Sequence, residues 1–364
     1  MDLFVVGTSR SGSTMVREIL AGHPDVAILN ESHWLPWLHH LFGRTAGPVD
    51  DMLDVVGRTH WDTGRPVIEV NAELAGMEWR DLRSRVRTRL GTTATLDRLH
   101  DEITRQLFGA DSAVLADKTP DYGFYMRLLQ DLWPRARFLH VVRDGLTTAL
   151  SMSRHSGVRR QVAGGFDNWC PLAYGSLYAH LEDRFSPPAD FVATWRRRLD
   201  RIRAEAAGLR PDTYFEVRYE HLLDDPRRAI SDVARFMGVD TDPAWLDEVS
   251  HIPRPRNREV DASVLPMLSL ADLRRLSELG EGRHLMLAPD GDAHLAQDQL
   301  REGDEAMIAG DADRAMLVGL SILATAAAGS DAGLRAGAIA LVAEAASVLA
   351  IPIDSLRAEV EALA

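Results

Sequence analysis

The chain has little cysteine: Cys170 stands alone among 364 residues. A single cysteine excludes an intramolecular disulfide framework and a zinc site built from several cysteines. Positive charge is also in short supply, because 41 lysines and arginines face 54 aspartates and glutamates, for a formal net charge of −13. This balance argues against a nucleic-acid-binding protein that relies on neutralising phosphates. An anion site in this chain must therefore be a local basic pocket within an acidic protein.

Long hydrophobic runs are absent as well. No run reaches the roughly 20 apolar residues of a membrane helix, and the richest stretch, Leu317 to Ala328, is short and rich in alanine. The apolar run at the N-terminus stops at Gly7, which does not fit a signal peptide. We therefore expect a cytoplasmic protein without membrane insertion. The composition, 46% hydrophobic and 26% charged, is ordinary for a globular protein.

Strand-like and helix-like segments alternate over residues 1–250, which predicts an α/β domain with a mainly parallel sheet. Strands are expected in the run that ends at Gly7 and over residues 26–29, 113–116, 137–142 and 213–217. Helices are expected over residues 79–90, 96–108, 122–133, 145–154, 189–208 and 226–237. The glycine-, proline- and aromatic-rich residues 156–188 are expected to form a long loop region. From about residue 270 onward only helices are indicated, which predicts a domain over 1–268 and a helical extension over 269–364.

The stretch from Phe4 to Thr14, FVVGTSRSGST, joins a short strand to a helical pattern through a glycine/serine loop. Strand, loop and helix N-terminus form an anion site, because unpaired N–H groups and the helix dipole converge there. The spacing nearly matches the nucleoside-triphosphate loop G-x-x-x-x-G-K-[ST]. Ser13 replaces the lysine that would reach the β- and γ-phosphates, and Arg10 supplies an earlier cation. The loop is expected to bind a phosphate but not the tail of ATP; a turn without a ligand is the alternative.

A second candidate anion contact is Arg143, which follows the predicted strand over 137–142. Open α/β sheets place ligands at this end of their strands. Ser151 lies eight residues further on, about two turns into the next helix, so that guanidinium and hydroxyl could flank one phosphate. The alternative is an ion pair of Arg143 with Asp144 or Asp117 at the sheet edge.

Glu31 and Lys118 also follow short predicted strands. Glu31 could be a general base, a helix cap or a solvated charge, and the residues alone favour the last two. Lys118 precedes a helix that starts with proline, so its ammonium is expected to point into the crevice at the end of the sheet. A lysine on the surface is the alternative.

In order and spacing these segments resemble the signature of sulfotransferases that use 3′-phosphoadenosine 5′-phosphosulfate, over about residues 3–250. The resemblance implies a P-loop-like three-layer fold. It also implies that Arg143 and Ser151 hold the 3′-phosphate. The missing lysine is then explained, because this donor has no γ-phosphate. The 5′-phosphosulfate loop implied by the R-S-G-[ST]-T motif consists of Arg10, Ser11, Gly12, Ser13 and Thr14.

The stretch RSGSTMVREILAGHPDVAILNE resembles the tyrosylprotein branch of that family without a gap. A glutamate at the same offset is the catalytic base there, which implies this role for Glu31. His33 is the second candidate, because other branches use histidine. The K-T-P motif implies that Lys118 places a cation near the transferred sulfonate, where negative charge grows on the bridging oxygen. The Y-E-x-L element places Tyr219 near the nucleotide, with plain packing as the alternative.

The function implied is transfer of a sulfonate to a hydroxyl, with no metal required. A P-loop kinase or ATPase, disfavoured by Ser13, and a non-catalytic nucleotide-binding scaffold are the alternatives.

The expected acceptor is a small molecule, such as a secondary metabolite, carbohydrate or glycolipid, and a homodimer remains an option. His155 matches a position at which relatives carry a cation. Candidates to line the acceptor pocket, or else to form core, are Trp34, Trp37, Trp61, Trp169 and Tyr174.

Overall fold

The computed structural model describes residues 1–109, 112–174, 180–184, 186, 188–253, 293–310, 312, 315, 318, 319, 322 and 332–348. The chain divides into two compact units. The first consists of Met1–Arg143, His155–Phe185 and Arg196–Arg254, and the second of Asp144–Arg154, Ser186–Trp195 and Pro255–Ala364. The predicted boundary between residues 268 and 269 lies outside the described residues, so it stays a prediction.

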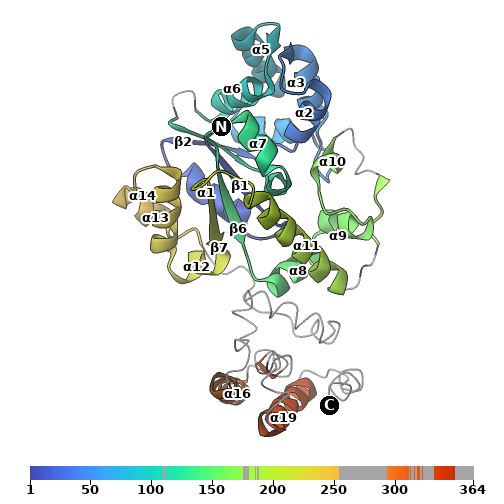
Figure 1. The fold of residues 1–364 in the computed structure, drawn as a ribbon, viewed down its shortest axis with the longest axis vertical. Coiled ribbons are helices and arrows are strands. Elements are labelled where there is room, and N and C mark those ends of the chain that lie inside the picture. The colour runs from blue at the N-terminus through green and yellow to red at the C-terminus, as the bar shows by residue number, and fades with distance from the viewer. Residues whose placement is uncertain are drawn as a thin grey trace. The chain divides into compact units, whose positions relative to one another are not determined.

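A five-stranded parallel sheet runs through the first unit in the order β2-β5-β1-β6-β7 (Figure 1). The chain places β2 and β5 on one side of β1 and then crosses to the other side for β6. The carboxyl end of β1 is therefore the switch point, where open α/β sheets bind ligands. The strands are β1 (Leu3–Gly7), β2 (Val26–Asn30), β5 (Val114–Lys118), β6 (Arg137–Val142) and β7 (Tyr214–Arg218).

Alternate residues of β1 enter two separate cores. Phe4 and Val6 pack in one core, and Leu3 and Val5 pack in the other. The first core lies under α2 (Leu35–Phe42), α3 (Val49–Gly57), α4 (Val67–Leu74), α5 (Trp79–Leu90), α6 (Leu96–Phe108) and α7 (Met126–Leu132). The second lies under α1 (Ser13–Ala21), α12 (Tyr219–Asp224), α13 (Pro226–Met237) and α14 (Pro243–Val249). Helices thus cover both faces of the sheet, and the predicted three-layer α/β fold is confirmed.

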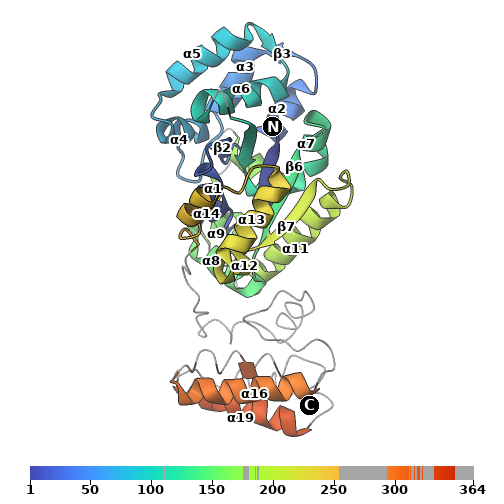
Figure 2. The same ribbon diagram turned by 90° about the vertical axis from the view of Figure 1, so that its left-hand side faces the viewer.

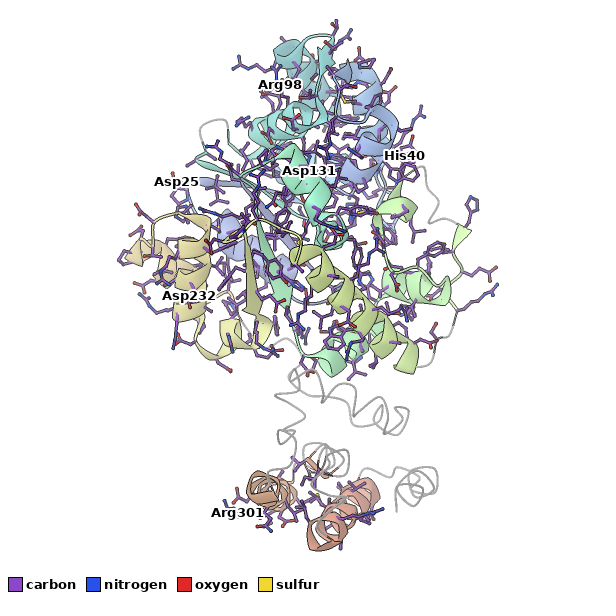
Figure 3. All side chains as sticks on the ribbon, viewed as in Figure 1. Asp25, His40, Arg98, Asp131, Asp232 and Arg301 are labelled. Carbon is purple, nitrogen blue, oxygen red and sulfur yellow. The ribbon has the colours of Figure 1, made fainter. Side chains whose placement is uncertain are left out.

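Charged side chains lie on the outside of this unit. Asp25, Arg98 and Asp131, which are labelled in Figure 3, are all exposed. The small antiparallel sheet of β3 (Gly47–Pro48) and β4 (Thr93–Ala94) lies among the helices of the first core. Asp117 and Lys118 are exceptions, because both are buried at the carboxyl edge of the large sheet.

The structure differs from the sequence prediction in two places. The helix predicted over 122–133 is a 3₁₀ turn, η1 (Pro120–Phe124), followed by α7. The loop predicted over 156–188 contains α9 (Ser156–Ala163) and α10 (Cys170–Ala173), so that prediction was wrong there. These helices are short, and tertiary packing of residues such as Leu172 stabilises them in spite of a weak local pattern.

In the second unit the described elements are helices. They include α8 (Gly145–Arg154), the beginning of α11 (Pro188–Ala206), α16 (Ala293–Ile308) and α19 (Ala332–Val348). Figure 2 shows α16 and α19 side by side. A Cβ at Gly303 would lie 2.4 Å from Leu341, so the glycine allows this close approach. Across the described residues of both units, no helix is long and apolar enough to cross a membrane.

Candidate active site

The loop between β1 and α1 presents backbone donors at the switch point of the sheet. Gly12 begins α1 in a left-handed conformation, with φ 98° and ψ 11°, and no side chain caps this end of the helix. The first N–H groups of α1 can therefore bind an anion, which the helix dipole also favours. Ser11 Oγ is buried and lacks a hydrogen-bond partner among the described residues. A buried hydroxyl without a partner beside an uncapped helix fits a phosphate ligand.

Arg143 and Tyr219 lie against this loop, although they are far from it in sequence. A Cβ at Gly12 would lie 2.4 Å from Tyr219 Cδ2, so the phenol ring packs directly on the glycine. The Arg143 guanidinium carbon lies 4.6 Å from the centroid of that ring, and Nη1 donates to the Arg10 carbonyl over 3.4 Å. Arg143 is therefore beside the glycine turn, as the predicted site with two phosphates requires.

Arg10 adds a second positive charge at the same place. Its φ of 70° is uncommon for a residue with a side chain and costs energy. Burial lowers the pKa of Arg10, the charge of Arg143 lowers this pKa further, and the charge of Glu31 opposes both effects. Two cations held this close repel each other, and an anion bound between them would relieve the repulsion.

Glu31 and Lys118 are neighbours because β2 and β5 pair in parallel register. Asn30 lies opposite Lys118, and the Glu31 N–H donates to the Lys118 carbonyl over 2.7 Å. Lys118 Nζ donates to Glu31 Oε1 over 2.5 Å. The lysine side chain is 1% exposed and the glutamate side chain 17%. The two side chains therefore form a buried ion pair, and the alternative of a surface lysine was wrong.

The ion pair fixes the charge of Glu31. Burial by itself raises the pKa of this carboxyl, but the Lys118 ammonium and the hydrogen bond with His33 outweigh burial and lower the pKa from 4.5 to about 2. Glu31 is thus ionised and accepts hydrogen bonds at neutral pH. His33 Nε2 lies 3.0 Å from Glu31 Oε2. The two residues considered as the base therefore belong to one hydrogen-bonded cluster.

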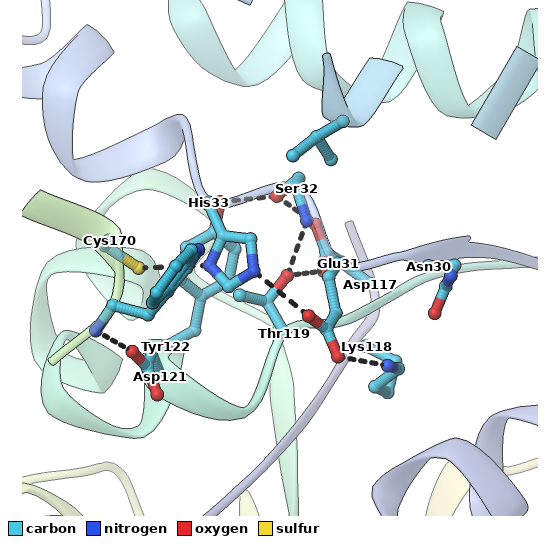
Figure 4. Close-up of polar contacts among 12 residues, drawn as sticks. Asn30, Glu31, Ser32, His33, Asp117, Lys118, Thr119, Asp121, Tyr122 and Cys170 are labelled. Carbon is cyan, nitrogen blue, oxygen red and sulfur yellow. Dashed lines mark hydrogen bonds and ion pairs between the residues drawn. The ribbon is translucent and has the colours of Figure 1, made fainter. Parts of the chain in front are cut away.

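A buried carboxylate, Asp117, holds the segment that follows β2. Ser32 Oγ donates to Asp117 Oδ2 over 2.6 Å, and Thr119 Oγ1 donates to Oδ1 over 2.5 Å. The Ser32 N–H in turn donates to Thr119 Oγ1 over 2.7 Å, and the Tyr122 hydroxyl contacts Ser32 Oγ (Figure 4). These bonds tie the segment after β2 to the segment after β5. The Asp117 oxygens are engaged here rather than with Arg143.

The backbone of this segment is strained. Glu31 has φ 53° and His33 has φ 59°, in the left-handed region that favours glycine. Such conformations persist only where the surroundings determine them strongly, and they cluster at functional sites. The side chain of Asn71 contributes, because it accepts from the Asn30 N–H over 2.8 Å and donates to the Asn30 carbonyl over 3.0 Å.

A cavity of about 140 Å³ connects the loop with Glu31. The indole rings of Trp61 and Trp169 line it, and His33 meets both edge to face at centroid distances of 5.6 and 6.4 Å. The remaining lining residues are Ser9, Arg10, Ser13, Thr14, Pro120, Asp121, Asp62, His155, Gly157, Val158 and Gln161. The lining thus combines residues of the anion-binding loop with Glu31 and with an aromatic part formed by Trp61 and Trp169.

The structure brings most of the predicted site residues to one edge of the sheet in the first unit. They are Arg10, Ser11, Gly12, Ser13, Thr14, Glu31, Lys118, Arg143 and Tyr219. Ser151 lies on α8 in the second unit, and its pairing with Arg143 stays a prediction.

Five aromatic residues were candidates for the acceptor pocket, and only some of them line it. Trp61 and Trp169 line the cavity, whereas Trp34 is fully buried and donates to His100. Trp37 and Tyr174 stack on each other and are absent from the lining.

Several lining residues were missed by the sequence analysis, Gln161 and Asp62 among them. Gln161 lies on α9, which the sequence did not predict. Asp62 carries no motif, and only the fold shows its place in the cavity wall. Among the described residues, no group of three or more histidine, cysteine, aspartate or glutamate side chains is arranged to hold a metal ion.

Residues 2–243 match the sequence model of a family described as "Sulfotransferase family". The chain belongs to this family. The family resemblance predicted from the motifs is thereby confirmed, and sulfotransferases of this family imply the use of 3′-phosphoadenosine 5′-phosphosulfate.

Named relatives are distant in sequence. Protein-tyrosine sulfotransferase 2 of Gallus gallus is 23% identical over 262 residues, which cover 68% of this chain and 53% of that protein. Omega-hydroxy-beta-dihydromenaquinone-9 sulfotransferase Stf3 of Mycobacterium bovis is 24% identical over 129 residues, 34% of this chain and 28% of that protein. Among solved structures, the sulfotransferase domain of the Synechococcus PCC 7002 olefin synthase has 24% identity and a TM-score of 0.45, covering 67% of this chain and 75% of that one. The first of these relatives is nearly twice as long as the matched region, so the chain spans about half of its length.

Proposed function

We propose that this sulfotransferase moves a sulfonate from 3′-phosphoadenosine 5′-phosphosulfate to a hydroxyl of a small molecule, with Glu31 as the general base. The observation that carries the proposal is one cavity whose lining brings Arg10 and the uncapped start of α1 together with Glu31, the ion-pair partner of Lys118. A nucleophile activated by Glu31 would meet a sulfonate held at the loop within this cavity.

The residues at the loop fit a nucleotide with two phosphate groups. Arg10 and the first N–H groups of α1 would hold the 5′-phosphosulfate, and the unpartnered Ser11 hydroxyl would gain a partner. Arg143, held against the Tyr219 ring, would bind the 3′-phosphate, with Ser151 as its proposed companion. The bound donor supplies the sulfonate and a phosphate leaving group.

Glu31 and Lys118 would have different roles in the reaction. The Glu31 carboxylate accepts the proton of the attacking hydroxyl, which requires hydrogen-bond reach. The Lys118 ammonium stabilises negative charge on the oxygen that leaves sulfur. When Lys118 turns from Glu31 towards that oxygen, the charge that lowers the pKa of Glu31 moves away. The base therefore becomes stronger as the leaving group is engaged.

The aromatic end of the cavity supports a small acceptor with an apolar body. Trp61 and Trp169 offer flat apolar walls, and the volume of about 140 Å³ suits a ring or a short chain. Asp62 and Gln161 supply polar groups on the same wall that can orient substituents.

The test is Glu31→Gln, assayed with a radiolabelled sulfonate donor and a panel of phenols and aliphatic alcohols. We expect turnover to fall by at least roughly 100-fold, since general base catalysis contributes about 10²- to 10⁴-fold. Affinity for 3′-phosphoadenosine 5′-phosphate, measured by calorimetry, should stay within a few fold. Glu78→Gln is the matched control, because Glu78 is an exposed residue at the start of α5.

Two results would contradict this assignment. Equal losses of turnover and nucleotide affinity in Glu31→Gln would show that the residue shapes the donor site instead. Activity with ATP and magnesium, but none with the sulfonate donor, would favour a P-loop kinase.

A further inference from the structure

His33 lies between two side chains that come from distant parts of the chain. Its Nε2 is 3.0 Å from Glu31 Oε2, and its Nδ1 is 3.7 Å from Cys170 Sγ, within hydrogen-bond reach for sulfur (Figure 4). His33 is 3% exposed and Cys170 is fully buried. The ring is therefore contacted at both nitrogens, by the half-buried Glu31 on one side and the fully buried Cys170 on the other.

The charge of Glu31 decides which ring nitrogen carries hydrogen. Lys118 keeps Glu31 ionised, so both carboxylate oxygens only accept hydrogen bonds. A 3.0 Å contact between Oε2 and Nε2 then requires a proton on Nε2. In a neutral ring Nδ1 carries the lone pair. Burial raises the pKa of Cys170 well above its usual value, so its S–H remains and can donate weakly to Nδ1.

Further hydrogen bonds hold Cys170 and Glu31, the two residues that contact His33, in place. The Cys170 N–H donates to Asn168 Oδ1 over 3.0 Å, and its carbonyl accepts from Trp37 Nε1 over 3.1 Å. On the other side, Glu31 Oε1 accepts from Lys118 while Oε2 accepts from His33. Each carboxylate oxygen thus has one fixed donor, which fixes the plane of the carboxylate.

We propose that Cys170 and His33 are positioning residues for the base: the thiol orients the imidazole, and the imidazole Nε2–H orients the Glu31 carboxylate. His33 is then not the base itself, because its Nε2 already carries a proton and its Nδ1 faces Cys170. This inference rests on the proposed role of Glu31 and assigns distinct roles to the two candidate bases. It predicts that a side chain able to donate from the Nε2 position can replace His33.

The kinetic test compares His33→Gln with His33→Leu. The glutamine amide can place an N–H near the Nε2 position, whereas leucine has no donor. We expect His33→Leu to lower kcat by roughly 10- to 150-fold, as for loss of a hydrogen bond to a charged group. His33→Gln should retain at least about a third of the wild-type kcat. In both variants the affinity for 3′-phosphoadenosine 5′-phosphate should stay within a few fold.

The pH dependence of kcat shows whether His33 orients Glu31 through a hydrogen bond or only packs against it. Removing the Nε2–H also removes a donor that lowers the pKa of Glu31, so this pKa rises in His33→Leu. The acid limb of kcat should therefore move to higher pH in His33→Leu and stay in place in His33→Gln. Equal inactivity of the two variants would overturn the proposal, because a histidine that acts as the base cannot be replaced by glutamine.

The spectroscopic test needs no catalysis. In the ¹⁵N-labelled full chain at pH 7, the His33 signals are those missing from the spectrum of His33→Gln. We expect a proton on Nε2; a ring without a proton on Nε2 would overturn the proposal whatever the kinetics show. Cys170→Ala should lower kcat by roughly 2- to 5-fold, in line with a weak hydrogen bond. An unchanged kcat would show that Cys170 does not orient His33. If no acceptor is turned over, the proposed function fails while the tautomer still tests the contacts of His33.

Discussion

At the residue scale, Glu31 is ionised in a place where burial alone would favour the neutral acid. The Lys118 ammonium and the hydrogen bond with His33 lower its pKa from 4.5 to about 2. An ion pair this deeply buried is weak evidence for stability, because desolvation offsets much of the attraction. Glu31 also lines the cavity, so its ionised carboxylate is accessible to a molecule bound there.

The Glu31 ion pair should make stability depend on pH. Because the folded pKa is depressed, the contribution is complete above about pH 4.5 and is lost as pH falls towards 2. The shift corresponds to about 3 kcal/mol as an order of magnitude. We expect the free energy of unfolding of the wild type to exceed that of Glu31→Gln at pH 7, and the gap to narrow between pH 4.5 and 2.

Urea unfolding of both proteins at a series of pH values measures this gap. Glu78→Gln should show no gap that changes with pH, since Glu78 is exposed. A gap for Glu31→Gln that is the same at pH 7 and pH 3 would contradict the depressed pKa.

At the element scale, the predictable parts are those with a strong local pattern. The helices over 79–90 and 96–108 have the bounds expected from their periodicity, and the strand over 137–142 is β6 as expected. Arg10, Glu31, Lys118 and Arg143 could be grouped from the sequence because parallel strands end at the same edge of a sheet. The contact of His33 with Cys170 spans 137 residues, and no local pattern predicts it. The same holds for α9 and α10, which tertiary packing stabilises.

The glycine at the start of α1 gives a prediction at this scale. In Gly12→Ala a Cβ would lie 2.4 Å from Tyr219 Cδ2, so the Tyr219 ring and the Arg143 guanidinium stacked on it must move. We expect affinity for 3′-phosphoadenosine 5′-phosphate to fall at least about tenfold, equivalent to about 1.4 kcal/mol. Gly76→Ala is the control, because Gly76 also has a positive φ, 65°, but a Cβ added there would meet no atom within 4 Å.

Calorimetric titration of the two variants distinguishes strain from obstruction. Both substitutions should lower stability, since a left-handed conformation costs roughly 1–2 kcal/mol outside glycine. Only Gly12→Ala should weaken nucleotide binding. Equal affinities in the two variants would mean that the ring on Gly12 does not shape the donor site.

At the scale of the whole molecule, an acidic protein of net charge −13 concentrates two arginines and an uncapped helix start at one point of its sheet. The net negative charge of the protein does not attract anions in general. Affinity for an anionic ligand must therefore come from the local contacts of this site. We expect this site to bind an adenosine nucleotide with a 5′- and a 3′-phosphate. Arg143, which lies against the loop although it is distant in sequence, is the most important residue for that binding.

The most direct measurement is calorimetric titration of the full chain with 3′-phosphoadenosine 5′-phosphate and, separately, with ATP and magnesium. We predict one site for the first nucleotide, much weaker binding of ATP, and a loss of at least about tenfold in Arg143→Met, as for a charged hydrogen bond. Arg98→Met should bind as the wild type does, because Arg98 is exposed on α6. Absence of binding, or binding that Arg143→Met leaves unchanged, would contradict the account.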